Sequence, residues 1–358
     1  MTLLWINLIL VFAFAFFARY FAAPAYAGGF SHTIRPNKLL ILGSMSVLIM
    51  IAGLRSNIGD TFFYKLIYTS NEFTWEYVLS EKDIGFGVMQ MVLKNYISED
   101  PQIMIFTAAL ITNILIVAVL YNYSRMVELS LYVYITGGLF LVSMNGIRQL
   151  LAAAIAFLAI RYLMNGNFFK YAAIVVLASL FHQSALILLP VYFLVRFKAW
   201  SKATVVLILL SVLVVIGYEA FTTLLFSAIE DTQYANYDSF AEGGANILRV
   251  AVEAAPLFIA YLGREKLRSI FPNSDFIINM ALIGFVFMVI STQEWIFARL
   301  AIYFQLYQLI LISWLPVLFR EKDQKFVYLA ILGCYFGYYF YENVITLNII
   351  YESDFLGR

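Results

Sequence analysis

The chain has 358 residues, of which 63% are hydrophobic and 13% charged, with a formal net charge of +1. Soluble domains have about 45–50% apolar and about 25% charged residues, so this composition excludes a single water-soluble core and makes lipid the solvent for most of the chain. The net charge itself neither favours nor excludes nucleic acid, and we expect no such partner; the lone Cys334 excludes an intrachain disulfide and a cysteine-based metal site.

Candidate membrane spans follow one another along the chain. A spanning helix needs roughly 17–25 mostly apolar residues. The first apolar run follows Met1-Thr2 without a basic segment, so we expect a retained helix and not a secretory signal. The sequence predicts an all-α, polytopic transmembrane helix bundle of about 12 spans in a single domain, 1–358. The spans are 3–22, 38–54, 101–121, 129–145, 147–164, 168–182, 183–197, 203–226, 246–262, 275–292, 294–317 and 326–346.

The distribution of charge predicts that the N-terminus lies outside. Lys and Arg concentrate in the cytoplasmic loops of membrane proteins. With the N-terminus outside, the inner loops hold 15 of the 23 basic residues, while 17 of the 22 acidic residues lie outside or near the outer boundary. The inner basic residues are Arg19, Arg35, Lys38, Arg125, Arg161, Lys170, Arg196, Lys198, Lys202, Arg264, Lys266, Arg268, Arg320, Lys322 and Lys325.

Two predicted extracytoplasmic loops are too long to be simple connectors. Residues 55–100 form the first, and its stretch 62–68 mixes apolar and polar residues as amphipathic helices at a membrane surface do. Residues 227–245 form the second, with four acidic residues and no basic one. Long loops in compact proteins are usually functional or disordered, and the aromatic content of both loops argues against disorder.

Four polar clusters lie at the outer ends of predicted spans. Ionisable groups near bilayer depth cost about 2.5–3.5 kcal/mol on insertion scales, which makes them functional candidates. Each cluster alone has a simpler explanation, because arginines snorkel to headgroups and glycine or asparagine marks turns. Independent snorkelling residues should populate both faces, so their common face favours one site. The clusters are 53–61, 145–149, 181–184, and Glu294 with Arg299.

The residue types in these clusters suit a doubly anionic, lipid-linked saccharide. Guanidinium groups bind phosphate oxygens in fork geometry, so the arginines are expected to hold a diphosphate. Carboxylates or an imidazole would accept the proton of an attacking sugar hydroxyl. The expected diphosphate ligands are Arg55, Arg148 and Arg299. The candidate bases are His182, Asp60 and Glu294, and the candidate saccharide contacts are Tyr64, Asn145 and Gln149.

No cofactor or metal is expected. The sequence has no Asp-x-Asp pair, and its Glu-x-Asp pairs, which include Glu81/Asp83, are interpreted as solvated charges. It also contains no Walker loop, dinucleotide fingerprint or HExxH motif, so nothing indicates a nucleotide-driven pump.

Six short motifs occur in order along most of the chain: 35–40, 53–55, 99–104, 145–149, 179–186, and 297–299 with Tyr303. Individually they are weak, but in this order and spacing they resemble the EpsG family of Wzy-like polysaccharide polymerases. The arginine of the family's Arg-Gln turn falls on Arg148, and the histidine of its Phe-His-x-Ser-Ala motif falls on His182. The family pattern Gly-Thr-Asp is replaced by Gly59-Asp60-Thr61, so the family's acid does not carry over directly to Asp60.

The resemblance implies a membrane glycosyltransferase of the bacterial cytoplasmic membrane. It would join undecaprenyl-diphosphate-linked oligosaccharide repeat units into biofilm exopolysaccharide at the outer face. The implied partners are the lipid-linked substrate, membrane lipids and other exopolysaccharide biosynthesis proteins.

Two other functions fit the residues as well. One is a transporter or flippase for the same lipid-linked saccharide, although transporters tend to bind near the midplane and to have repeated halves. The other is an acyltransferase that decorates polysaccharide and uses His182 as its base.

Overall fold

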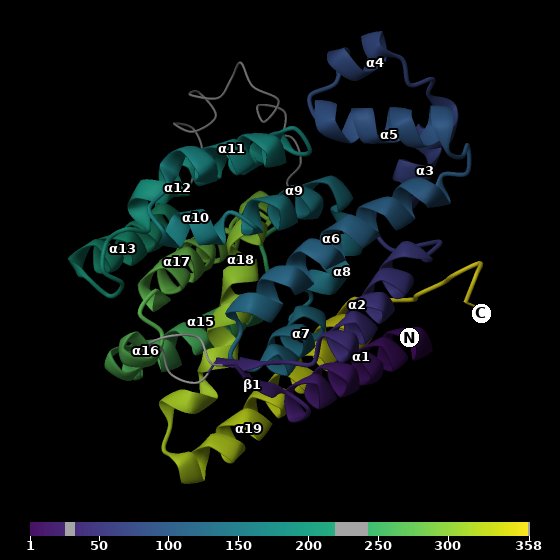
Figure 1. Cartoon of the computed structure of the whole chain (residues 1–358). Coiled ribbons are helices and arrows are strands. Elements are labelled where there is room, and N and C mark those ends of the chain that lie inside the picture. The colour runs from purple at the N-terminus through teal and green to yellow at the C-terminus, as the bar shows by residue number, and fades with distance from the viewer. Residues whose placement is uncertain (26–32, 219–242, 357–358) are drawn as a thin grey trace. The chain divides into compact units, whose positions relative to one another are not determined.

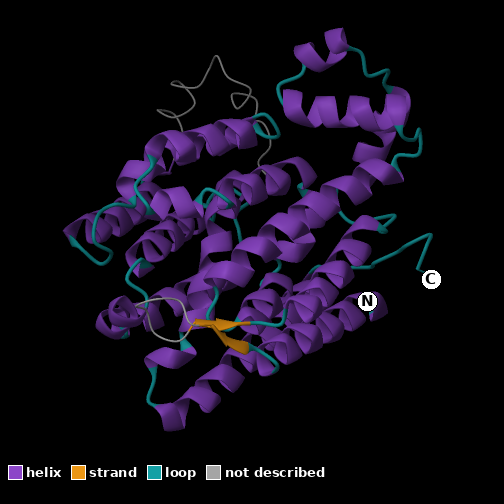
Figure 2. Cartoon of the chain, in the orientation of Figure 1, coloured by secondary structure: helices purple, strands orange, loops and turns teal. Residues whose placement is uncertain are grey.

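The computed structural model describes residues 1–25, 33–218 and 243–356. This part of the chain is helical apart from one short hairpin (Figures 1 and 2), which confirms the predicted helical class. It divides into two compact units, Met1–Tyr192 with Leu309–Arg358, and Phe193–Gln308. The single-domain organisation therefore stays a prediction.

The first unit contains most of the helices. Within it, α1 packs on α2 and α7, α2 on α6, and α6 and α11 on α9 (Figure 1). Its α-helices are α1 Thr2–Tyr20, α2 Lys38–Gly53, α3 Thr61–Ser70, α4 Trp75–Ser80, α5 Ile84–Tyr96, α6 Gln102–Tyr123, α7 Val127–Thr136, α8 Leu139–Asn145, α9 Ile147–Phe157, α10 Ile160–Met164, α11 Phe168–Ser179 and α19 Glu321–Tyr339. Shorter turns are η1 Gln183–Ile187, η3 Pro316–Leu318 and η4 Phe340–Thr346, and α12 Leu188–Leu194 and α18 Ile296–Trp314 cross the unit boundary.

A two-stranded antiparallel hairpin joins α1 to α2. Strand β1 Ala23–Ala25 pairs with β2 Thr33–Arg35, with Ala23 opposite Arg35 (Figure 2). Helix α2 then begins at Asn37, whose side-chain oxygen accepts hydrogen bonds from the backbone N–H groups two and three residues later, at 3.0 and 3.3 Å. This cap satisfies donors that the first helical turn leaves open.

Within the described residues the helices coincide with the predicted apolar runs, but about 12 spans are not confirmed. Residues 219–226 of the predicted span 203–226 lie outside the described residues. Three helices, α1, α6 and α18, are long and apolar enough to cross a membrane, and the pair α7–α8 makes a fourth if its 54° bend lies within one span. Six more apolar helices of the described chain are shorter. The predicted run 129–145 is broken because Gly138 has φ +92°, a conformation that favours glycine. The apolar content of a run does not predict where the helix within it is broken.

The first long loop, 55–100, folds into the three helices α3, α4 and α5. Helix α3 buries Thr61 and Tyr68 and exposes its large apolar side chains, so its outward face is the apolar one. A helix at a membrane surface has such a face. The exposed apolar residues are Phe62, Phe63, Leu66 and Ile67. The second loop, 227–245, with its acidic residues Glu230, Asp231, Asp238 and Glu242, lies almost wholly outside the described residues.

Lys94, on α5, is bound to the C-terminal end of α3. Its ammonium group donates to the backbone carbonyls of Tyr68, Thr69 and Asn71 at 2.7, 3.0 and 2.8 Å. A cation suits the C-terminal end of a helix, where carbonyls are open and the helix dipole is negative. Tyr68 is fully buried and donates to the Ser98 carbonyl at 2.8 Å, and burial raises the pKa of its hydroxyl to about 12.

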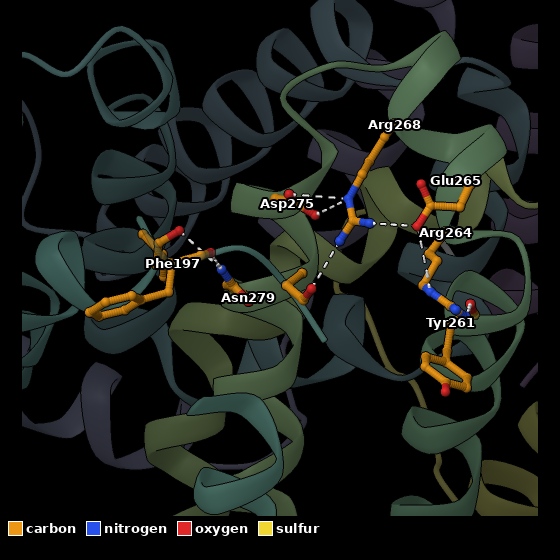
Figure 3. Close-up of polar contacts among 9 residues, drawn as sticks. Phe197, Tyr261, Arg264, Glu265, Arg268, Asp275 and Asn279 are labelled. Carbon is orange, nitrogen blue, oxygen red and sulfur yellow. Dashed lines mark hydrogen bonds and ion pairs between the residues drawn. The ribbon is translucent and has the colours of Figure 1, made fainter. Parts of the chain in front are cut away.

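The second unit contains α13 Lys202–Ile216, α15 Ile247–Leu262, α16 Arg264–Ile270 and α17 Ser274–Ile290. Helix α17 packs against α13 and α15. The predicted inner loops of this unit are joined by Arg268, which bonds Asp275 at 3.0 Å, Glu265 at 3.0 Å and the Ala199 carbonyl at 2.9 Å (Figure 3). Asn279 adds hydrogen bonds to the carbonyls of residues 195 and 197, at 3.0 and 2.6 Å.

Replacing Lys94 should loosen the loop helices. Lys94→Met keeps the apolar stem but leaves three carbonyls without their charged donor, and hydrogen bonds to charged groups are worth about 1.5–3 kcal/mol each. We expect a lower midpoint in thermal unfolding of the detergent-purified protein and faster proteolysis within 61–96. Lys82→Met, at an exposed position in the same loop, is the control. Equal melting of the two variants would show that Lys94 does not hold this segment.

Candidate functional site

The carboxylate of Asp83 joins two of the predicted site residues, Arg148 and His182. It lies between α4 and α5 and is 8% exposed. Its Oδ2 accepts from Nη1 of Arg148 at 2.9 Å and lies 3.3 Å from Nδ1 of His182, while its Oδ1 accepts from the backbone N–H of Gln183 at 3.2 Å. Segments separated by 65 and 99 residues in the chain therefore meet on one carboxylate.

A close backbone approach brings these segments together. The N–H of Gly85, at the start of α5, donates to the carbonyl of Leu180, at the end of α11, at 2.7 Å. A Cβ at position 85 would lie 2.9 Å from the Leu180 Cβ, closer than real Cβ atoms come. Glycine is thus required where the loop helices meet α11, and this contact places Asp83 beside the turn that carries His182.

Arg148 projects from the first turn of α9 and keeps access to solvent. Its side chain is 41% exposed, and its guanidinium carbon lies 5.9 Å from the ring centre of Tyr64 on α3. Tyr64 in turn contacts Phe86 edge to face at 6.1 Å. An arginine has five N–H donors, more than Asp83 and Tyr64 use, so this guanidinium can still bind an anion.

The pair of Asp83 and His182 has the arrangement of an oriented base. A carboxylate on Nδ1 favours the tautomer with its proton on that nitrogen, which leaves Nε2 as the acceptor. The histidine side chain is 25% exposed, so a ligand can reach it. Nucleophile activation commonly uses a base that a third group orients in this way. The cluster therefore combines a proton acceptor and an anion-binding group.

Arg55 is placed differently from Arg148. It is 1% exposed, and its guanidinium donates to the carbonyl of Ala52, to Oγ1 of Thr61 at 3.0 Å and to the carbonyl of Met144 at 2.7 Å. Burial lowers its pKa to about 9, with Tyr351 and Tyr64 acting in the opposite direction, so the group stays protonated at neutral pH. In this position Arg55 joins the ends of α2 and α8 and is closed to solvent.

Asn145 and Asp60 are brought together at a tight turn. The side-chain oxygen of Asn145 accepts from the backbone N–H of Asp60 at 3.0 Å. Gly59 has φ +51°, and a Cβ there would lie 2.1 Å from the same Asn145 oxygen. The asparagine thus fixes the turn that leads into α3, and only glycine fits beside it.

Three other predicted site residues lie on α9 or in the second unit. Gln149 follows Arg148 on α9 but is 6% exposed. Glu294 and Arg299 belong to the second unit, where the guanidinium carbon of Arg299 lies 4.3 Å from the ring centre of Trp295. Within the described residues, no group of three or more His, Cys, Asp or Glu could hold a metal ion.

Asp83 is the residue that the sequence analysis missed. The interpretation of Glu81/Asp83 as solvated charges is wrong for Asp83, since its carboxylate is nearly buried and binds three donors. One signal was available: Asp83 precedes Ile-Gly-Phe-Gly, where an acid begins a helix with two glycines in its first turns. Such glycines indicate close packing of backbone, and hence a carboxylate held against another segment.

Comparison with known proteins identifies one family. The family model described as the EpsG family matches residues 38–353, which include α2, the loop helices and every residue of the Asp83 cluster. No curated protein and no solved structure matches the chain.

The turn at Gly59 provides a test of the site's framework. Gly59→Ala adds a Cβ at a positive φ and in collision with Asn145, so we expect a lower unfolding temperature and less protein in the membrane. Gly333→Ala, inside α19 with open space around the position, is the control and should melt at or above the wild-type temperature. If both alanine variants melted alike, the turn would not be constrained as described.

Proposed function

Because the chain belongs to the EpsG family, we propose that it polymerises undecaprenyl-diphosphate-linked oligosaccharide units into exopolysaccharide at the outer face of the cytoplasmic membrane. The observation that carries the proposal is the carboxylate of Asp83, which holds both His182 and Arg148 at hydrogen-bond distance. A base and an anion-binding group are the two functions that transfer from a lipid diphosphate requires.

The reaction assigns one role to each member of the cluster. Nε2 of His182 takes the proton of the acceptor sugar hydroxyl, whose oxygen bonds to the anomeric carbon of the growing chain. The bond from that carbon to the diphosphate oxygen breaks, and its electron pair leaves with the lipid diphosphate. Arg148 compensates the charge that develops on this leaving group, and Asp83 orients both partners.

The remaining candidates keep proposed roles around this centre. Asp60 would serve as an alternative base. The roles of Glu294 as a base and of Arg299 as a diphosphate ligand stay predictions, since both residues lie in the second unit. Tyr64, Asn145 and Gln149 would line the saccharide path. Arg55 is better suited to holding the framework than to binding substrate, since its donors are used internally. The proposed reaction needs no metal or cofactor.

One observation favours transport of the lipid-linked saccharide as the second candidate. Glu253 on α15 is 8% exposed, bonds the side chain of Gln305, and accepts at its backbone carbonyl from Gln308 at 3.1 Å. Carboxylates within apolar helices are common in transporters. Purified protein in vesicles with lipid-linked repeat units separates the two: a polymerase lengthens the saccharide, whereas a flippase moves unchanged units between leaflets.

Substitutions in the cluster should remove polymerisation without removing the protein. His182→Ala is expected to lower turnover by about 10²–10⁴, the usual contribution of a general base. Asp83→Asn should lower it because an amide no longer favours the required tautomer. Arg148→Lys should recover only part of the activity lost in Arg148→Ala, since an ammonium group cannot bind two phosphate oxygens in fork geometry. Saccharide length is measured with purified protein and lipid-linked repeat units.

The matched control is Glu81→Gln, which removes an exposed acid two residues from Asp83 and should leave product length unchanged. Polymer of normal length from His182→Ala or Arg148→Ala, at normal protein level, would rule out the site. Unaltered activity of Asp83→Asn would rule out its orienting role.

The proposed topology predicts the labelling of single cysteines. In a Cys334→Ser background, Lys82→Cys should react with a membrane-impermeant maleimide on intact cells, because position 82 adjoins Asp83 and is exposed. Lys322→Cys, at the predicted inner end of α19, should react only after permeabilisation. The opposite pattern would place the site in the cytoplasm and contradict the proposed function.

A further inference from the structure

The C-terminal segment beyond η4 lies against the end of α2. Residues 348–356 follow α19 and η4 in the chain and contact residues 51–57, almost 300 positions earlier. The hydroxyl of Tyr351 donates to the Ile51 carbonyl at 2.7 Å, and the hydroxyl of Ser353 donates to the Leu54 carbonyl at 2.5 Å. Both side chains are buried, at 7% and 5% exposure.

These two contacts complete the C-terminal end of α2. A helix leaves its last four carbonyls without intrahelical donors, and such groups are costly when buried. Arg55 takes the carbonyl of Ala52, and Gln102 takes that of Gly53 at 2.6 Å. The flanking carbonyls of residues 51 and 54 accept hydrogen bonds from the hydroxyls of Tyr351 and Ser353 in the C-terminal segment. Four consecutive carbonyls are thus satisfied by side chains, and two of these come from the end of the chain.

Asn57 binds the backbone of the same segment with both ends of its amide. Its Nδ2 donates to the carbonyl of Ile350 at 2.8 Å, and its Oδ1 accepts from the N–H of Glu352 at 2.9 Å. The N–H of Ser56 donates to the Glu352 carbonyl at 2.9 Å. These hydrogen bonds are all made to the main chain of the segment, while the Glu352 side chain is exposed. Recognition of an added strand at an open sheet edge likewise uses main-chain hydrogen bonds.

The clamped turn leads directly to the candidate site. Residues 54–60 pass from the end of α2 to α3, where Thr61 bonds Arg55 and Tyr64 lies against Arg148. A shift of the turn would move Tyr64 and the Asp60–Asn145 contact, and this would displace Arg148. A misplacement of about 1 Å can lower turnover by about 10²-fold.

We propose that the C-terminal segment 348–356 is a positioning element of the site, a clamp that holds the turn 54–60 and thereby Arg148. The inference rests on the proposed function, because it assigns this role within the same reaction. Tyr351, Ser353 and Asn57 are its positioning residues. The clamp also puts the C-terminal segment on the same side of the membrane as the site.

A pair of variants at one position tests the clamp. Glu352→Pro removes the N–H that Asn57 accepts, whereas Glu352→Gln keeps it and changes only an exposed side chain. We expect Glu352→Pro to lower the turnover number for repeat-unit transfer by 10-fold or more at an unchanged unfolding temperature, and Glu352→Gln to match the wild type. Equal turnover in the two variants, or a loss explained by a lower unfolding temperature, would overturn the proposal.

A second measurement covers the case in which Glu352→Pro fails to fold. Asn57→Ala and a chain ending at Leu347 should each lower turnover, and the double variant should be no slower than the truncated chain, because the truncation already removes both hydrogen bonds of Asn57. If the loss of turnover in the double variant equalled the product of the two single losses, Asn57 and the C-terminal segment would act independently, which would contradict the clamp.

A third measurement does not depend on activity. In the Cys334→Ser background, Ser56→Cys with Glu352→Cys keeps Asn57 and joins two residues whose backbones are hydrogen-bonded, so it should form a disulfide on mild oxidation, whereas Asn122→Cys with Glu352→Cys should not. Absence of the first crosslink would reject the clamp even if the wild type polymerises. Its presence, with no polymer from the wild type, would reject the proposed function and leave the contact in place.

Discussion

The end of α2 is the constraint on which the site depends. Backbone carbonyls cannot be left open where water is excluded, so the last turn of this helix needs donors from elsewhere. A buried guanidinium, an amide and two hydroxyls supply them, and the guanidinium also reaches the end of α8. Its charge suits two helix ends, where the dipole is negative. Satisfying one helix terminus thus brings α2, α6, α8 and the end of the chain to a single point.

Around this point, polar side chains divide into two kinds. Arg55 is enclosed and uses its donors on the protein itself, whereas Arg148 and His182 keep 41% and 25% exposure and share one carboxylate. An enclosed side chain can fix the positions of the helix ends it bonds, whereas a partly exposed side chain can contact a ligand. The two arginines look alike in sequence, since each lies two residues after a glycine near a helix end. Their different burial follows from which helix ends surround them, so that one arginine is enclosed and the other can reach a ligand.

Much of the fold was predictable because a long apolar run is stable in lipid only as a helix, which satisfies its own backbone hydrogen bonds. Helices occur at the predicted runs, and asparagines cap α2 and α11 where polar residues precede such runs. The number of spans was not predictable in the same way. Gly138 bends the run 129–145, and a window of average hydropathy does not sense one backbone angle. The hairpin between α1 and α2 was missed because short strands between spans have no apolar run of their own.

The sequence by itself determined that the chain is a helical membrane protein of the EpsG family, and it named Arg148 and His182 among nine candidate site residues. These properties are available from the sequence because composition, turn residues and the order of motifs do not depend on how the chain folds. Tertiary structure alone decided that Asp83 joins Arg148 to His182, that Arg55 is enclosed, and that Tyr351 and Ser353 complete the end of α2. Each of those contacts spans from 65 to about 300 positions of the chain. Hydrogen-bond partners at such separations are set by how helices pack, and no local pattern records that packing.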